Sequence, residues 1–70
     1  MRNIFEQICS RHGLNIDNFD DGQEYDAGIV QFTDEHNKLV VDLLVYKQQY
    51  SVTKFDGTKL FSGTWTSVIN

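Results

Sequence analysis

The sequence predicts an α+β domain in which a short N-terminal helix packs on a four-stranded antiparallel meander sheet. Three observations lead to this prediction: apolar residues at helical spacing near the N-terminus, four β-rich segments joined by short polar turns, and a register that puts their apolar residues on one face. The chain has 70 residues, enough for one core, so residues 1–70 are taken as a single domain. Within it we expect a helix over about residues 3–12, an acidic loop over 13–26 and the sheet over 27–69.

The helix is predicted from its two ends and from its apolar stripe. Asn3 followed by Glu6 is a variant of the capping box, in which each side chain bonds a free backbone amide at the helix start. Gly13 stands where glycine ends many helices. Between these ends the apolar residues fall on one face: Ile4, Phe5, Ile8 and Cys9.

Short connections between the β-rich segments predict strands that are neighbours in sequence order. The strands are expected over residues 28–33, 38–47, 50–55 and 59–68. Asp56-Gly57 is the strongest hairpin signal, because a two-residue type I′ turn needs positive φ at both positions.

The turn lengths then set the register of the sheet. A four-residue first turn pairs Phe32 with Leu39. Two-residue middle and last turns pair Val52 with Val45 and with Phe61. These choices place the following residues on one face, which the helix is expected to cover: Val30, Phe32, Leu39, Val41, Leu43, Val45, Tyr50, Val52, Phe61 and Trp65.

Charge is sharply divided along the chain. Residues 13–37 contain no lysine or arginine and carry −7, although the whole chain carries only −4. Such a field attracts basic surfaces and repels nucleic acid. Seven carboxylates form this candidate partner-binding segment: Asp17, Asp20, Asp21, Glu24, Asp26, Asp34 and Glu35.

The charge pattern predicts a binding protein that is not an enzyme. We expect an inhibitor or regulator whose carboxylates occupy the places of phosphates on a basic, nucleic-acid-binding surface of a partner protein. Small acidic proteins that phages or mobile elements use against host defence are of this kind. No direct binding to nucleic acid is expected. A solvated loop that keeps a small protein soluble explains the same charges, and the sequence leaves both interpretations open.

An accessory or structural subunit is the alternative function. The last strand of a meander has a free edge, and Lys59 is its only charged residue, so this edge can pair with a partner or with a second copy in a homodimer. An apolar patch on the outer face of the sheet offers another contact surface: Leu44, Tyr46 and Leu60. A third interpretation is a sheet that stacks single-stranded nucleic acid on its aromatic residues, although the net acidity argues against it.

Catalytic and metal-binding patterns are weak. An EF-hand alignment of the acidic segment puts Phe19 and Gly28 at required ligand positions. Cys9 and His12 have metal-ligand spacing, but His36 is the only obvious further ligand and Cys9 belongs to the apolar stripe. The serines lack an elbow motif and the glycines are scattered. We therefore expect no catalytic residues, no metal and no cofactor.

The segment lengths and the cysteine count predict a cytoplasmic protein without a membrane anchor. The N-terminus lacks the apolar run of a signal peptide, and the longest apolar stretches are interrupted by Asp42. Cys9 is the sole cysteine, so no intrachain disulfide can form and a reducing compartment is indicated.

Overall fold

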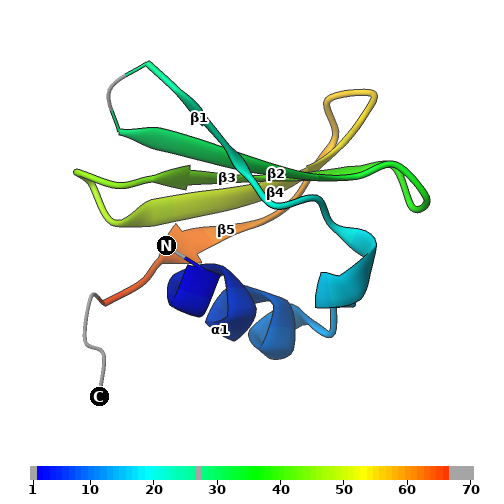
Figure 1. Ribbon diagram of the computed structural model, residues 1–70, viewed down its shortest axis with the longest axis horizontal. Coiled ribbons are helices and arrows are strands. Elements are labelled where there is room, and N and C mark those ends of the chain that lie inside the picture. Colours follow the sequence, from blue (N-terminus) through cyan, green and yellow to red (C-terminus); the bar gives the residue numbers. More distant parts are fainter. Residues whose placement is uncertain (1, 27, 67–70) are drawn as a thin grey trace.

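The computed structural model describes residues 2–26 and 28–66 and confirms an α+β fold with an N-terminal helix and an antiparallel sheet. Helix α1 (Arg2–His12) is followed by a 3₁₀ turn, η1 (Ile16–Asn18). The sheet has five strands rather than the predicted four, and they lie in chain order (Figure 1). The strands are β1 (Gln23–Tyr25), β2 (Ile29–Asp34), β3 (Leu39–Leu44), β4 (Gln49–Lys54) and β5 (Lys59–Thr64).

The additional strand, β1, lies inside the segment that the sequence predicts as an acidic loop over residues 13–26. It pairs antiparallel with β2, with Gln23 opposite Gln31 and Tyr25 opposite Ile29. Its three residues are all exposed, so they lack the alternation of apolar and polar residues that marks a strand in a sequence. At the other end of the sheet β5 ends at Thr64; of the predicted sheet, residues 27 and 67–69 lie outside the described residues.

Helix α1 ends as predicted but begins differently. It starts at Arg2, so Asn3 lies inside the first turn and cannot be the N-cap of the predicted capping box. At its end Gly13 has a φ of 70°, and the N–H of Leu14 donates to the carbonyl of Cys9 at 2.8 Å. This is the closing bond of a Schellman motif. No helix in the described part of the chain is long and apolar enough to cross a membrane.

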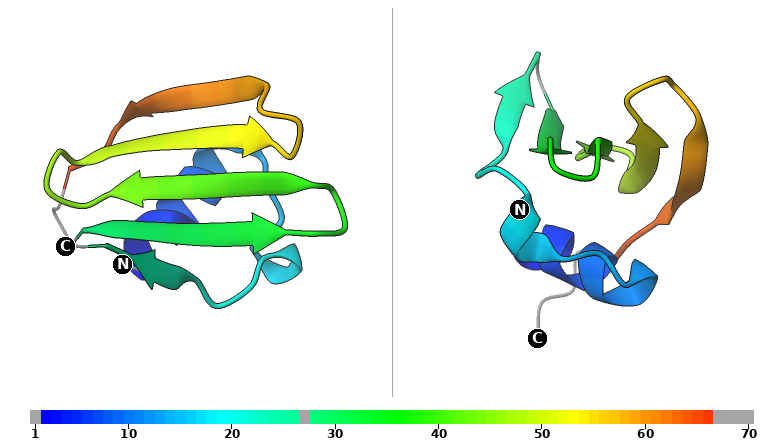
Figure 2. Two further views of the ribbon diagram at one scale, coloured as in Figure 1. Left: turned by 90° about the horizontal axis from the view of Figure 1, so that it is seen from above. Right: turned by 90° about the vertical axis from the view of Figure 1, so that its right-hand side faces the viewer.

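The core lies between α1 and the concave face of the sheet. The right-hand view of Figure 2 shows the sheet curving round, with α1 across its open side. The ring of Phe5 stacks on Phe32 with centroids 3.8 Å apart and meets Phe19 edge-on at 5.1 Å. The buried cluster consists of Ile4, Phe5, Ile8, Cys9, Phe19, Phe32, Val41, Leu43, Tyr50, Val52 and Trp65.

The register differs from the predicted one by even numbers of residues. Phe32 pairs with Val41 rather than Leu39, a shift of two, and Val52 pairs with Val41 rather than Val45, a shift of four. Because side chains alternate between the faces of a sheet, an even shift leaves the residues of β2, β3 and β4 on their predicted faces. The prediction of the core face therefore holds for these three strands, although the predicted pairs between them are wrong. Phe61, in β5, was placed on the same face but remains 38% exposed.

The turns explain these shifts. The β2–β3 and β3–β4 connections each contain four residues, and each ends in a residue with positive φ, Lys38 at 59° and Gln48 at 52°. Non-glycine residues adopt this conformation only occasionally. Because lysine and glutamine adopt it here, no glycine marks either turn in the sequence.

The β4–β5 hairpin keeps the predicted pair of Val52 and Phe61, but its turn is not the predicted two-residue type I′ turn. The N–H of Lys54 donates to the carbonyl of Thr58 at 2.8 Å, which leaves residues 55–57 as a three-residue turn. Gly57 alone has positive φ in it, at 93°. A bulge between the pairs of Val52 and Thr53 takes up the extra residue.

Candidate functional site

The loop after η1 is fastened to β2 by Asp20. The N–H of Asp20 donates to the carbonyl of Thr33 at 3.0 Å, and its Oδ1 accepts the N–H of Thr33 at 3.1 Å. The same Oδ1 accepts the N–H of Gly22 at 3.0 Å, which closes an Asx turn. These bonds hold η1 and the following loop against the end of β2, where the β2–β3 turn begins.

A hollow of about 300 Å³ lies at this junction. Asp20 and Glu35, which are far apart in the sequence, both line it. The full lining consists of Asn18, Phe19, Asp20, Thr33, Glu35 and His36. The structure therefore brings Glu35, in the first hairpin turn, onto the same surface as the carboxylates that follow η1.

Asp34 is the exception among the seven predicted carboxylates, because it is only 1% exposed. Its Oδ1 accepts the backbone N–H of Asn37 and its Oδ2 accepts the side-chain amide of Asn37, both at 2.9 Å. These bonds satisfy the carboxylate within the β2–β3 turn. The position of Asp34 therefore indicates that it shapes the turn rather than facing a partner.

Glu24 and Asp26 continue the acidic surface along one edge of the sheet. β1 is an edge strand that pairs only with β2, and both carboxylates are exposed. Asp26 has a φ of 49° in the turn that leads from β1 toward β2. From Glu35 to Asp26 the surface follows the six residues of β2, roughly 20 Å at 3.3 Å per residue. We call its six exposed carboxylates the acidic edge: Asp17, Asp20, Asp21, Glu24, Asp26 and Glu35.

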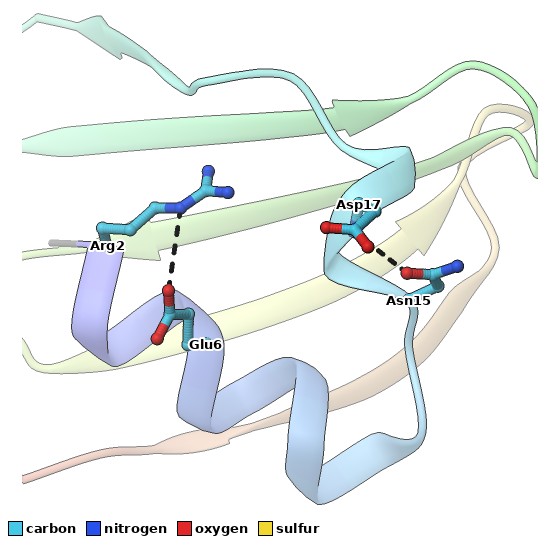
Figure 3. Close-up of polar contacts among 4 residues, drawn as sticks. All are labelled: Arg2, Glu6, Asn15 and Asp17. Atoms are coloured by element: carbon cyan, nitrogen blue, oxygen red, sulfur yellow. Dashed lines mark hydrogen bonds and ion pairs between the residues drawn. The ribbon is translucent and has the colours of Figure 1, made fainter.

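The acidic edge has no counter-ions of its own among the described residues. The ion pair found among the described residues lies elsewhere, on α1, where Arg2 Nε is 4.0 Å from Glu6 Oε2 (Figure 3). Asp17 lies in η1, and its backbone N–H donates to Oδ1 of Asn15, the N-cap residue of η1, at 3.0 Å (Figure 3). Uncompensated charges of one sign on a surface produce a field that attracts the opposite charge.

The structure divides the predicted apolar patch. Leu44 and Tyr46 line a common hollow of about 150 Å³ together with Gly28, Ile29 and Lys47. Leu60 lies in β5, is 42% exposed and does not line this hollow.

Helix α1 covers part of the β5 edge on which the alternative function depends. Nη1 of Arg11 donates to the carbonyl of Thr64 at 3.5 Å, and the ring of His12 stacks on Phe61 with centroids 4.2 Å apart. The bulge beside Leu60 further distorts the strand. Bulges and covering groups are means by which proteins protect free edges. The sequence shows only the single charge of Lys59 in this role.

The residues considered as metal ligands have other surroundings. Cys9 is 2% exposed, and burial raises the pKa of its thiol to about 11, so the thiol is protonated at neutral pH. Nε2 of His12 lies 2.6 Å from the Tyr50 hydroxyl, whereas His36 lies in the β2–β3 turn. The described residues contain no group of three His, Cys, Asp or Glu side chains placed to hold a metal ion.

Two features of the site were not predicted from the sequence. The attachment of the acidic loop to β2 has a local signal, because Asp20-Asp21-Gly22 has the composition of an Asx turn. The contact between His12 and Tyr50 has none, since these residues are 38 positions apart.

Comparison of the chain with protein-family models, with curated proteins and with solved structures found no match.

Proposed function

We propose that this domain is a binding protein whose acidic edge engages a basic surface of a partner protein. The observation that carries the proposal is the set of six exposed carboxylates on η1, on the loop after it, on β1 and in the turns at the two ends of β2, in a segment without lysine or arginine. The bonds of Asp20 to Thr33 and the pairing of β1 with β2 hold these carboxylates on a folded scaffold. A scaffold of this kind differs from a solvated loop, because its charges keep their relative positions when a partner binds.

The partner chemistry follows from the charge. A row of fixed carboxylates offers a nucleic-acid-binding protein the same kind of contact as a row of phosphates, since lysine and arginine bind both groups. We therefore propose an inhibitor or regulator, without enzyme activity, that competes with nucleic acid for a basic groove. Cys9 is the sole cysteine and is free, which suits a reducing compartment, and we place the protein in the cytoplasm. A role in phages or mobile elements rests only on the small size and the acidity of the chain.

The proposal is tested by neutralising three carboxylates of the acidic edge. Asp17→Asn, Asp21→Asn and Glu24→Gln are combined, because these exposed side chains have no recorded hydrogen bonds in the described structure. Partners are captured from lysate at low and at high salt and identified by mass spectrometry, and the affinity of each purified partner is then measured. We expect the triple variant to bind roughly tenfold more weakly, at about 0.5 kcal/mol for each exposed ion pair. Added salt should weaken the parent chain more than the variant.

A variant with the same change in net charge is the control. Gln7→Lys, Ser10→Lys and Thr66→Lys also raise the net charge by three, but at exposed positions on α1 and after β5. If the acidic edge is the binding surface, the control keeps most of the affinity. Equal losses in both triple variants would show that net charge alone matters and would contradict the proposal. Capture that is insensitive to salt would also contradict it.

A further inference from the structure

Beside the acidic edge, the face of the sheet that points away from α1 carries an apolar row. Tyr25 pairs with Ile29, and Ile29 pairs with Leu44, so the three residues lie side by side across β1, β2 and β3. Leu43, the neighbour of Leu44, is fully buried in the core, so Leu44 faces the opposite side of the sheet. This row contrasts with the next row on the same face, in which Gln31 donates to Asp42 at 2.8 Å.

Tyr46 forms a wall at the end of this row. It is 82% exposed, yet its ring lies directly on the backbone of Gly28. A Cβ on Gly28 would come within 2.5 Å of two ring carbons, so only glycine lets the ring lie there. The N–H of Val45 also donates to the carbonyl of Gly28 at 2.8 Å, which fixes the β3–β4 turn against the start of β2. An exposed aromatic ring thus lies against the backbone at the start of β2.

The hollow between Tyr46 and the row has a volume of about 150 Å³. An enclosed apolar cavity of about this size accommodates benzene in proteins, and this hollow, which is open to solvent, has room for one side chain of similar size. Its lining is apolar except for Lys47, whose methylene groups can cover an apolar guest while the ammonium group stays in water. We call this hollow, with Tyr46 as its wall, the apolar corner.

The charges around the apolar corner are mainly negative. Asp26 follows Tyr25 in the sequence, and Asp42 lies on the same face as Leu44, whereas Lys47 is the only cation in the lining. Glu24 pairs with Val30 and therefore belongs to the other face of β1. A second copy of this chain would bring carboxylates against carboxylates here. A basic partner brings the complementary charge.

We propose that the apolar corner receives one aliphatic or aromatic side chain of a protein segment in which that side chain is flanked by lysine or arginine. This inference rests on the proposed function and adds an anchor to it: the carboxylates attract the basic segment, and the hollow selects the side chain that it carries. Buried anchors of this kind provide much of the affinity in protein interfaces, whereas exposed charges provide mainly steering.

Two synthetic peptides of equal length and equal lysine content test the inference. In one peptide leucine stands between the lysines, and in the other serine takes its place. Binding to the ¹⁵N-labelled protein is followed by NMR titration at low salt. We expect the leucine peptide to bind roughly tenfold more tightly, which corresponds to burial of one leucine side chain. The largest shifts should be those of the amides of Gly28, Leu44 and Lys47.

Tyr46→Ala removes the wall of the hollow and should reduce the preference for the leucine peptide to less than about threefold, with the serine peptide unaffected. Tyr46 is exposed, so its loss leaves the core intact. Tyr46→Phe should keep the preference. Phe55→Ala is the matched control, because Phe55 is also exposed, at 49%, and lies at the opposite end of the strands.

The outcomes separate the two proposals. If both peptides bind equally and salt weakens both, the apolar corner is not an anchor and only the further inference fails. If neither peptide binds at low salt, both proposals fail. A leucine preference that survives Tyr46→Ala would place the anchor elsewhere and overturn the inference. Self-association of the parent chain that is lost in Tyr46→Ala would assign the corner to a second copy and overturn it as well.

Discussion

The two edge strands of the sheet are held in different ways. β5 has six residues, and α1 covers its end through Arg11 on the carbonyl of Thr64 and His12 on the ring of Phe61. β1 has three residues, all exposed, and is connected to the body through Asp20, Gly22 and its pairing with β2. One edge is therefore covered by the helix, whereas the other is left open and carries fixed charges.

This difference shows how so small a domain divides its surface. A chain of this size buries only about 60% of its unfolded surface, so few residues can serve binding without weakening the core. Helix α1 packs in the concave face and reaches the β5 edge, and it leaves the β1 edge to carboxylates that need no burial (Figure 2). We expect substitutions at the two edges to differ in the same way: some loosen the structure, and others change only the charge.

Gly22→Ala should have the largest effect, because Gly22 holds β1 against the core. Its φ is 90°, and an added Cβ would lie 2.6 Å from the ring of Phe32, which is buried and stacked on Phe5. We expect the free energy of unfolding to fall by about 3 kcal/mol, from backbone strain and displacement of a packed ring. Urea unfolding followed by the fluorescence of Trp65 measures this change.

Gly57→Ala is the control for backbone strain alone. Gly57 has a similar φ of 93°, but an added Cβ meets no atom within 4 Å. We expect a loss of about 1 kcal/mol. If Gly22→Ala costs no more than Gly57→Ala, then Gly22 is not packed against Phe32, and the attachment of β1 described above is wrong.

Asp20→Ala and Asp21→Ala form a pair that separates structure from charge on the acidic edge. Asp20 accepts two backbone N–H groups, whereas no hydrogen bond is recorded for the exposed side chain of Asp21 in the described residues. We expect a loss of about 1.5 kcal/mol for Asp20→Ala and less than about 0.5 kcal/mol for Asp21→Ala. Each substitution removes one negative charge, so both should lower the affinity for a basic partner by a similar factor once the fraction of folded protein is taken into account.

Hydrogen exchange sharpens this comparison. The amide of Thr33 bonds to the carboxylate of Asp20, so it should exchange faster in Asp20→Ala and at the parent rate in Asp21→Ala. Unchanged exchange in both variants would mean that the loop after η1 is not fastened to β2. The acidic edge would then be a mobile loop, and the argument for fixed charges would lose its basis.

The core face was predictable from the sequence, whereas the register was not. Val41, Leu43, Tyr50 and Val52 were assigned to the core face, and all are buried. Their assignment depends on the two-residue period of a strand, which any even shift preserves. The register depends on turn length, and in both four-residue turns the positive φ falls on an ordinary residue, Lys38 or Gln48, which gives no sequence signal.

The candidate site was predictable in composition and not in arrangement. The absence of cations from residues 13–37 is visible directly, but β1 is not, because an exposed edge strand of three residues needs no apolar alternation. The burial of Asp34 was also hidden, since the four-residue turn was predicted over residues 34–37, whereas in the structure Asp34 is the last residue of β2 and the turn covers residues 35–38. Long-range pairing, rather than local propensity, decides which of the seven carboxylates face solvent.

Tyr50→Phe tests the edge that α1 covers, and its effect on stability should be smaller than those of Gly22→Ala and Asp20→Ala. It removes a hydroxyl that is 2.6 Å from His12 Nε2 and 3.5 Å from Arg11 Nη1, and it leaves the buried ring in place. We expect a loss of about 1 kcal/mol in unfolding free energy, the usual net value of one hydrogen bond. Tyr46→Phe, at an exposed hydroxyl, should change the stability by less than about 0.5 kcal/mol. Because the end of α1 fastens β5 and takes no part in the acidic edge, Tyr50→Phe should leave partner affinity at the parent value. A loss of affinity at unchanged stability would show instead that the two edges act together in binding.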